Sequence, residues 1–514
     1  MAGTKMEKKW LRVRNKKGSA LLSAYLVITS LLILGAAFIL LVTVESRTAE
    51  YQRRIATALY IADAGIERAL YDLRQDIITD PSSPSWSDGM INGWVVDIND
   101  TDSDGFYPLP DTSNAANSAY ASTSLSGGSY SVRIKNVSGS SDIWIRSAGT
   151  LGSVTQTIEV YASLINISPW NNAIFGGAGA SGALVNGNVN IFGSVHILGD
   201  GLAPGDNAID LGGTAELVGN NYAGLDSSLK ALVPALPTIV LGGETVETLG
   251  AELRVKNGLV GLSGNSAVGQ ANATGNAYKE TVDGAYVTDG YNGTAGTGNV
   301  YSDNGSTEGY DLGDAVSFPS LSNPYPDNPG QDYYEYFADN ALVLTTELAS
   351  VTPSSNLNLG DCSSNCVYMN ADGNLQVEGM VYVSGTNNLA LTSGDFTYSG
   401  KGTILVTGDV TIDANLITSG AESFPTNILG VMTPNDISLG ASSQKDIMGL
   451  FFAEGEVTAN KQTDVLGTLL TNYFDLSNQV PSIYQVPETV NNLPPGMIAG
   501  DAIWLMKVIS WKKI

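Results

Sequence analysis

The sequence predicts an α+β N-terminal module, made of one long helix and a small antiparallel sheet, followed by a large all-β domain. Three observations support this prediction. An uncharged apolar run lies at 19–44, alternating strand patterns follow at 128–165, and later residues repeat short β-branched runs between Gly, Asn and Asp. The chain has 514 residues, 58 glycines and 15% charged residues. That length suits two or three domains, and the composition suits an exported β protein.

The apolar run at 19–44 is long enough to cross a bilayer as a helix. A secretory signal would have a shorter apolar core and a small-residue cleavage site behind it. Directly before the run lies a basic leader, residues 1–18, in which Glu7 is the one acid. Because Lys and Arg stay on the cytoplasmic side, we expect the long remainder to be exported across the inner membrane. The basic residues of the leader are Lys5, Lys8, Lys9, Arg12, Arg14, Lys16 and Lys17.

The helical pattern continues beyond the apolar run and predicts one helix over 19–79. It would be roughly 90 Å long, and a proline shortly after it stops the pattern. Opposite charges four residues apart lie on one surface, in the pairs Glu50–Arg54 and Arg68–Asp72. Apolar residues at three- and four-residue spacing form a stripe on the other surface. The stripe consists of Ile55, Ala58, Leu59, Ala62, Ile66, Ala69, Leu70 and Leu73.

The junction between Gly18 and Ser19 resembles the class III signal of type IV pilins and pseudopilins. In that family a membrane peptidase cuts after the glycine, and the apolar helix stays on the mature subunit. The segment ADAGIERAL at 62–70 is similar to the A-E-A-G segment of PilX-type and GspK-like minor pilins. The resemblance implies a prepilin cleavage site at Gly18 and Ser19, a new N-terminus open to methylation, and packing of the helix against other pilins or pseudopilins.

One helix position separates members of that family. Major pilins carry a Glu at the fifth mature position, thought to pair with the N-terminal amine of a neighbouring subunit. Counted from Ser19, that position is Ser23. A buried Glu without a partner is costly in a membrane, so its absence suits a subunit with no neighbour ahead of it. GspK-like tip subunits and many PilX-type sequences show the same departure. Loss of the Glu without consequence is the alternative.

Residues 80–168 are predicted to supply the small sheet of the N-terminal module. Three segments there, 128–137, 142–151 and 154–165, alternate apolar with polar residues as half-buried antiparallel strands do. A Ser-Pro-Trp sequence then marks a boundary.

Residues 169–514 are predicted to form a separate Gly- and Asn-rich display domain. A single-stranded right-handed β-helix is the expected fold, because each coil would bury its apolar face only by stacking on its neighbours. A large β-sandwich is the alternative. Residues 268–340 have few strand signals and are expected to form a long surface excursion. Residues 375–511 also resemble a domain of unknown function often found behind PilX-type N-termini, a resemblance that implies no activity.

An Asp-rich loop is the candidate metal site. Asp100, Asp102 and Asp104 alternate before Gly105, and Asp111 stands where a twelve-residue calcium loop ends. Alternate carboxylates before a glycine turn can wrap one Ca²⁺, which takes six or more oxygen ligands. Asp in place of the usual final Glu, two prolines and the lack of flanking helices depart from that motif. A solvated acidic turn is therefore the alternative, while GspK-like pseudopilins are known to hold calcium.

The two cysteines, Cys362 and Cys366, are expected to form a local disulfide, since the chain is exported. Free thiols are the alternative. A metal site there is disfavoured, because His196 is the only histidine and no other cysteine exists.

No enzymatic activity is expected. His196 lies in an alternating strand, and the sequence marks no Ser-His-Asp arrangement around it. A glycoside hydrolase with paired carboxylates such as Asp409 and Asp413 is the enzyme alternative. A lyase is disfavoured, since such enzymes usually need a basic residue and Arg254 is the only arginine after residue 168.

Together with the resemblance, these features predict a minor pilin-like subunit of a type IV pilus or a type II secretion pseudopilus. It would be anchored in the inner membrane by one helix and would display its β domain for assembly or adhesion. Its expected partners are other pilins, the prepilin peptidase and a surface or glycan ligand. Nucleic acid is excluded by the formal net charge of −26. The alternative is a membrane-anchored β-helical adhesin or a glycan-binding or glycan-processing surface protein.

Overall fold

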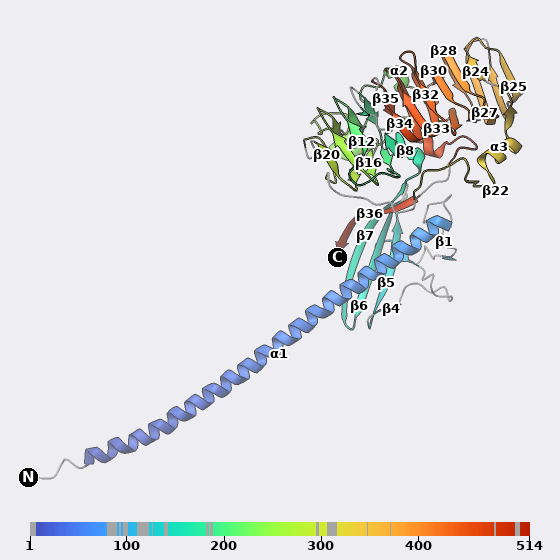
Figure 1. The fold of residues 1–514 in the computed structure, drawn as a ribbon. Helices are drawn as coiled ribbons and strands as arrows, with labels where there is room; N and C mark the ends of the chain where they lie inside the picture. The colour runs from blue at the N-terminus through green and yellow to red at the C-terminus, as the bar shows by residue number, and fades with distance from the viewer. Residues whose placement is uncertain are drawn as a thin grey trace, which may run out of the picture. The chain divides into compact units, whose positions relative to one another are not determined.

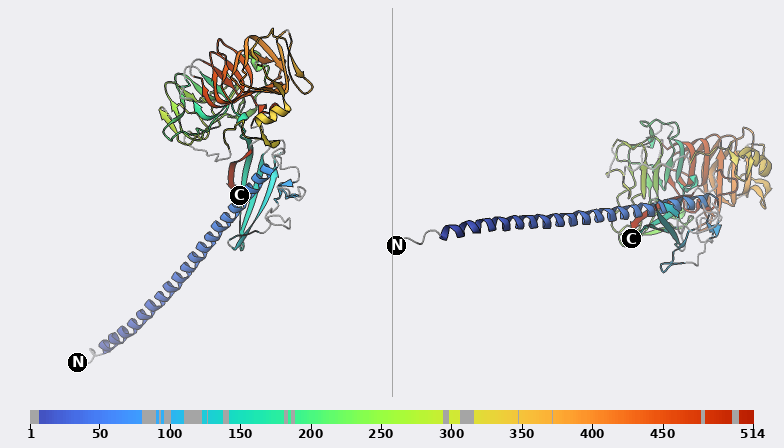
Figure 2. Two further views of the ribbon diagram at one scale, coloured as in Figure 1. Left: turned by 45° about the vertical axis from the view of Figure 1, so that its right-hand side comes forward. Right: turned by 90° about the horizontal axis from the view of Figure 1, so that it is seen from below.

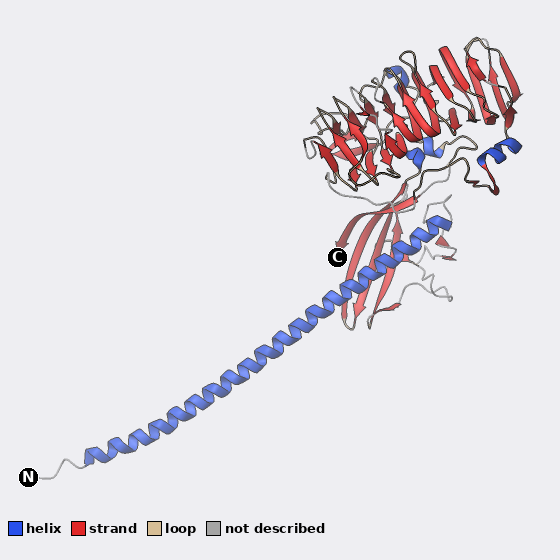
Figure 3. Cartoon of the chain, viewed as in Figure 1, coloured by secondary structure: helices blue, strands red, loops and turns tan. Residues whose placement is uncertain are grey.

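The structure is a computed structural model in which the chain forms two compact units (Figure 1). The helix–sheet unit combines Met1–Ile165 with Trp504–Ile514, and the stacked unit is Asn166–Ile503. Figure 3 shows one long helix and one sheet in the first unit and mainly strands in the second. The residues described are 7–79, 90–91, 94–95, 101–109, 123–125, 127–137, 142–180, 184–185, 189–293, 298–305, 316–346, 348–370, 372–476, 480–498 and 504–514.

The first element, α1, is one unbroken helix over Glu7–Thr79 (Figure 2). Its predicted end at residue 79 is confirmed. Its start lies earlier than the predicted residue 19, because the leader is rich in Lys and Arg, which are good helix formers, and contains no proline.

A six-stranded sheet completes the helix–sheet unit, in the order β3-β5-β6-β7-β36, with β4 paired to β5. The predicted antiparallel pairing is confirmed for β5 with β6 and for β6 with β7. A small separate pair, β1 with β2, is also antiparallel. The bounds are Met90–Ile91 for β1, Trp94–Val95 for β2, Tyr107–Pro108 for β3, Thr123–Leu125 for β4, Gly128–Asn136 for β5, Ile143–Leu151 for β6, Val154–Asn166 for β7 and Trp504–Lys513 for β36.

The predicted apolar stripe of α1 packs on this sheet. Six of its eight members are buried to 2% exposure or less, and Ile61 joins them. They meet the inward side chains of the strands, among them Val132, Ile145 and Ile158. The prediction that Asp72 lies on the surface opposite the stripe is wrong, since Asp72 is 1% exposed. Its carboxylate lies 3.2 Å from the Arg68 guanidinium. The six buried stripe residues are Ala58, Ala62, Ile66, Ala69, Leu70 and Leu73.

Glycine lets the helix approach β6 closely. A Cβ atom at Gly149 would lie 2.3 Å from both the Ala58 carbonyl oxygen and the Ala62 amide nitrogen. A Cβ at Gly65, on the helix side, would lie 2.3 Å from the Ser147 hydroxyl oxygen. Because the atoms facing Gly149 belong to the helix backbone, they cannot turn aside as a flexible side chain could.

The last strand corrects the predicted domain boundary at 169–514. β36 extends the sheet beside β7, so residues from Trp504 onward belong to the helix–sheet unit. The Ile514 amide donates to the Thr157 carbonyl at 3.1 Å, which places the end of β36 beside the start of β7. The two strands therefore run antiparallel, and the stacked unit is an insertion between neighbouring strands. Its length hides the pairing from the sequence.

The stacked unit is built from parallel strands that pair across successive coils. One row of pairings runs β23-β27-β29-β31-β33-β34-β8-β11-β16-β19, every one parallel. Parallel pairing rules out the antiparallel β-sandwich considered as the alternative, and the predicted large all-β domain is confirmed. The bounds are Ile174–Ala180 for β8, Val195–Ile197 for β11, Glu252–Val255 for β16, Gly284–Val287 for β19, Leu342–Leu344 for β23, Asn374–Val383 for β27, Lys401–Val406 for β29, Ile428–Thr433 for β31, Asp446–Ala459 for β33 and Asp464–Asp475 for β34.

A closed parallel barrel of seven strands stands where a plain β-helix was expected. Its pairings run β27-β28-β30-β32-β33-β31-β29 and return to β27. The reason is strand length, since β28 and β33 shift register midway, near Ser393 and Glu454, and each half pairs with a different neighbour. The remaining bounds are Leu389–Ser399 for β28, Val410–Thr418 for β30 and Ile437–Leu439 for β32.

The chain enters and leaves the stacked unit at the middle of its stack. β34 pairs in parallel with β8, and β35 with β10, although hundreds of residues separate them (Figure 1). Trp170, fully buried, closes this seam by donating its indole N–H to the Ile498 carbonyl at 2.7 Å. The strands from β8 to β19 form one half of the stack and lie progressively farther from the seam. The strands from β23 to β34 form the other half and approach the seam again. The strands β10 and β35 span Asn190–Phe192 and Ser482–Tyr484.

The predicted surface excursion at 268–340 is partly wrong, because β19 and β20 continue the parallel stack there. The smaller strands are β9 Leu184–Val185, β12 Asn207–Leu211, β13 Glu216–Gly219, β14 Thr238–Leu241, β15 Glu244–Glu247, β17 Leu259–Leu262, β18 Ala267–Val268, β20 Tyr291–Gly293, β21 Pro324–Tyr325, β22 Asn328–Asp332, β24 Leu348–Val351, β25 Leu357–Asp361 and β26 Asn365–Met369. The short helices are α2 Ser227–Lys230, α3 Tyr333–Asn340, η1 Pro169–Asn171 and η3 Thr489–Asn491.

Replacing Gly149 by valine should destabilise the helix–sheet unit by about 1–3 kcal/mol, because the new side chain meets helix backbone that cannot yield. Thermal unfolding of the full chain in detergent, followed by circular dichroism at a helical wavelength, measures the effect. Gly205→Val is the matched control, since a Cβ at Gly205 meets nothing within 4 Å. Equal unfolding temperatures for the two variants would contradict the close helix–sheet contact.

Candidate assembly surface and other predicted sites

The first half of α1 presents an apolar surface that no other described part of the chain covers. By length and composition the helix can cross a membrane, with a mean hydropathy of 2.7 in a window that is 0% buried. Leu21 is 77% exposed and Leu34 is 70% exposed. Side chains of this kind are stable in lipid or against another protein, and not in water. The surface includes Leu22, Tyr25, Leu26, Ile28, Leu31, Leu32, Ile33, Phe38, Ile39, Leu40 and Leu41.

Hydroxyl side chains within this segment bond to the helix itself. The Ser23 hydroxyl donates to the Ser19 carbonyl at 2.8 Å. Thr29 and Thr43 do the same toward the carbonyls four residues before them, each at 2.7 Å. This back-bonding satisfies polar groups that would be costly in an apolar medium. Ser23 stands where major pilins carry a Glu, and its hydroxyl adds no charge to the apolar surface. Gly18 lies in the helical backbone, directly before Ser19.

The Asp-rich loop is bonded to the sheet through arginine. Asp102 lies 3.1 Å and Asp104 3.0 Å from guanidinium nitrogens of Arg146, on β6. The same guanidinium bonds Glu159, on β7, at 2.8 Å. Its central carbon also lies 3.9 Å from the centre of the Phe106 ring. One arginine thus joins three carboxylates from the loop and the neighbouring strand.

The charge state of Asp102 follows from this arrangement. Partial burial disfavours the ionised form, but hydrogen bonds from the Phe106 and Asp104 amides and the charge of Arg146 outweigh it. The pKa of Asp102 therefore lies below its ordinary value. The hydrogen bonds that the Asp104 and Phe106 amides donate to the Asp102 carboxylate are each 3.0 Å long.

The calcium site stays a prediction. Asp100 and Asp111 lie outside the described residues, and the carboxylates of Asp102 and Asp104 are directed at Arg146. Within the described ranges, no group of three or more acidic, histidine or cysteine side chains is placed to hold a metal ion.

Cys362, in the turn after β25, forms a disulfide with Cys366, in β26, and their Cα atoms are 4.8 Å apart. This hairpin is antiparallel and lies against β27, whereas the rows behind it are parallel. The pairing covers part of an edge that would otherwise have open hydrogen-bonding groups.

His196 lies in β11 and is 1% exposed. Its ring meets the Phe175 ring edge-on, with the centroids 4.9 Å apart. Burial, with smaller effects from Arg254 and Lys256, lowers the pKa of His196 to about 3, so the imidazole is neutral at pH 7. These contacts agree with a structural position in the stack.

Asp409 directly precedes β30, and Asp413 lies within that strand. Asp409 is exposed, and the Asp413 carboxylate accepts a hydrogen bond from the Ser442 amide at 2.9 Å. That hydrogen bond holds the loop before β33 in place, so the role of Asp413 in the structure is to position this loop.

A row of polar residues on the stack was missed by sequence reasoning. Asp446 pairs in register with Asp464 on the next coil, and Asp464 pairs with Ser482 on the coil after that. In-register parallel strands lie about 4.8 Å apart, so the two carboxylates are close neighbours. No sequence signal identifies the pair, because unequal coil lengths decide which residues align.

Burial and the nearby charge of Asp446 raise the pKa of Asp464 to about 6, against a weaker opposing hydrogen bond from Ser482. The charge of Asp226 adds a small repulsion that also raises the pKa of Asp464. The ionised pair is therefore a source of instability in the stack at neutral pH.

Comparison with solved structures shows similarity to a pilin, whereas two comparisons of the sequence find no match. No known protein family and no curated protein sequence matches the chain. Among solved structures, the chain is similar to the competence-associated pilin ComZ from Thermus thermophilus, at 17% sequence identity. The alignment covers 90% of this chain and 97% of that one, with a TM-score of 0.45. That score is too low to establish a shared fold, so the function proposed below rests on the chain's own helix, leader and sheet.

Asp464→Asn should stabilise the stacked unit at neutral pH. A raised folded-state pKa favours the neutral acid, so the contribution of Asp464 to stability is complete below the unfolded pKa of about 3.9 and is lost as the pH rises through about 6. The variant should remove about 1–2 kcal/mol of that loss, allowing for partial exposure. Unfolding temperatures at a series of pH values between about 4 and 8 measure it. The exposed Asp409→Asn is the control, and an equal change in both variants would contradict the assignment.

Proposed function

We propose that this chain is a minor subunit of a type IV pilin-like filament, which displays its stacked unit. The supporting observation is the division of α1 into two halves. One half is apolar and exposed along its length, while the other packs on an antiparallel sheet. In lipid no hydrophobic driving force brings the exposed halves of such helices together, since lipid is as apolar as leucine. Outside the membrane it must be covered, and neighbouring copies of such helices would cover it.

The leader supports the same proposal. Its basic residues precede Gly18, and the helix continues into the mature segment without a break. A prepilin peptidase would remove the leader, and the new N-terminal amine at Ser19 would be open to methylation. The partners are then the inner membrane and other pilins or pseudopilins.

A tip or accessory position is favoured by two features. Ser23 offers no carboxylate to the amine of a neighbour. The stacked unit, Asn166–Ile503, is also far larger than the helix–sheet unit that carries it, and bulk of this kind would obstruct regular packing of successive subunits. Adhesion or assembly, without enzymatic activity, is the role proposed for it.

The second candidate is a membrane-anchored surface adhesin or glycan-binding protein that never enters a filament. The same exposed helix would then serve only as an anchor. The two candidates differ in whether the leader is removed and whether the chain is recovered in filaments.

Cleavage between Gly18 and Ser19 is the first expected outcome. Mass spectrometry of the protein from membranes of the producing cell should find a chain that begins at Ser19. Gly18→Val should leave the leader attached, while Gly35→Val, deeper in the helix, should be processed normally. An intact leader on the unaltered protein would remove the filament proposal and favour a simple anchor.

A tip position should make the subunit scarce in filaments. Gold labelling of the stacked unit on isolated filaments should mark one end only. Ser23→Glu supplies the missing carboxylate and should increase the number of copies per filament. Ser30→Glu, which places a carboxylate elsewhere in the apolar segment, should not. Labels spaced regularly along the shaft of unaltered filaments would contradict the tip assignment.

A further inference from the structure

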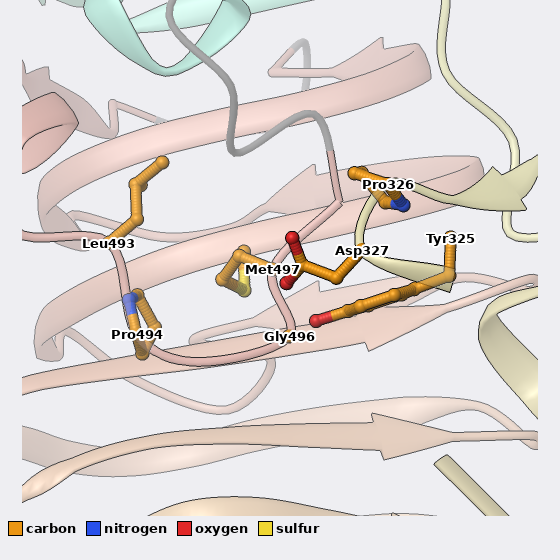
Figure 4. A pocket seen from close by; sticks show the side chains of 7 residues that line it. All are labelled: Tyr325, Pro326, Asp327, Leu493, Pro494, Gly496 and Met497. Atoms are coloured by element: carbon orange, nitrogen blue, oxygen red, sulfur yellow. The ribbon is translucent and has the colours of Figure 1, made fainter. Parts of the chain in front are cut away.

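A pocket of about 210 Å³ lies in the stacked unit, between two segments far apart in the sequence (Figure 4). One wall is formed by Tyr325, at the end of β21, and by Pro326 and Asp327 in the turn that follows. The other wall is the segment with Leu493, Pro494, Gly496 and Met497. No lining residue is basic. The volume is below the roughly 300–1,000 Å³ of pockets for drug-sized ligands, so it suits a group the size of one side chain.

The wall with Tyr325 is held by aromatic packing. The Tyr325 ring stacks on the Tyr336 ring at 3.6 Å between centroids, and it meets the Tyr333 ring edge-on at 5.1 Å. Both partners belong to α3, whose N-terminus is fixed by a capping box between Asp332 and Glu335. Tyr325 is only 8% exposed, so its ring has little freedom.

The opposite wall is held by close packing. Gly496 has φ of +78°, and a Cβ there would lie 2.7 Å from the ring of the fully buried Phe337. Met497, 5% exposed, is likewise fixed. Both walls thus rest on packed residues, and a ligand entering the pocket need not order them first.

The chemistry of the pocket is anionic. Figure 4 shows the Asp327 carboxylate extending toward Met497 and the Tyr325 oxygen toward Gly496. Asp327 is exposed and makes no hydrogen bond or ion pair with any residue that the structure describes. The cationic side chains Lys279 and Arg146, by contrast, each contact two or more carboxylates. On a chain of net charge −26, a carboxylate with no basic neighbour in a formed pocket favours a cation from outside.

We propose that this pocket binds an alkylammonium group, of the kind a lysine side chain carries. The ammonium would donate to the Asp327 carboxylate and to the Tyr325 oxygen, while its methylene stem packs on Pro494 and Met497. A lysine of a partner protein and a free amine share this chemistry. The proposal goes beyond the filament role, because the pocket can bind or fail to bind whether or not the chain enters a filament.

The test is ligand-observed saturation-transfer NMR on the full chain in detergent. The probes are Nα-acetyl-lysine methylamide, n-butylamine and Nα-acetyl-glutamine methylamide. The lysine derivative should bind with a dissociation constant of about 1 mM, as a few partly exposed contacts allow. Binding should weaken at high salt, which screens exposed charges. The glutamine derivative should not bind.

Asp327→Asn, which keeps the shape and removes the charge, should weaken binding about tenfold. Asp200→Asn, an exposed aspartate in the other half of the stack, is the matched control and should leave binding unchanged. Equal weakening in both variants would show general attraction to an acidic protein and would overturn the site, as would no binding of either amine or equal binding of the glutamine derivative. Tighter binding of the lysine derivative than of butylamine would assign the pocket to a partner protein. Equal binding of the two amines would assign it to the ammonium alone.

Discussion

The close contact between α1 and β6 is the constraint on which the helix–sheet unit depends. At Gly149 the strand backbone approaches the backbone of the helix so closely that no side chain fits between them. This approach brings Ala58, Ala62 and their stripe neighbours onto the inner face of the sheet. It also commits only the second half of the helix, so the first half remains apolar and without a partner in the described chain. The need for lipid or other subunits follows from that division.

The insertion of the stacked unit between β7 and β36 preserves this contact. Because the two strands are neighbours and antiparallel, the chain leaves the sheet and returns to it at adjacent positions. The stack has its own closure at the seam, where Trp170 bonds the Ile498 carbonyl and β8 pairs with β34. Each unit therefore completes its own core, and a large unit can be carried without interrupting the small sheet.

Some charged side chains form ion pairs inside the units, whereas others remain open to a ligand. Two cations form ion pairs inside the units: Arg146 joins the Asp-rich loop to β7, and Lys279, 3% exposed, bonds Asp303 at 2.7 Å. Asp446 and Asp464, by contrast, are aligned by the stack and repel each other when both are ionised, at a cost in stability at neutral pH. Asp327 is different again, because its carboxylate faces a formed pocket.

The sequence by itself determined the long helix, its end at residue 79, the apolar stripe, the antiparallel strands and the all-β character of the remainder, because each is a local pattern of polarity. It also located the two cysteines that form the disulfide. Only the tertiary structure decided that β36 returns to the first sheet, that Asp72 is buried, and that long bent strands close a seven-stranded barrel in place of a plain β-helix. The Asp446–Asp464 pair and the pocket with Tyr325 and Asp327 were likewise decided only by the tertiary structure. Each joins residues whose separation in the chain is set by irregular coils, and no local pattern encodes such a distance.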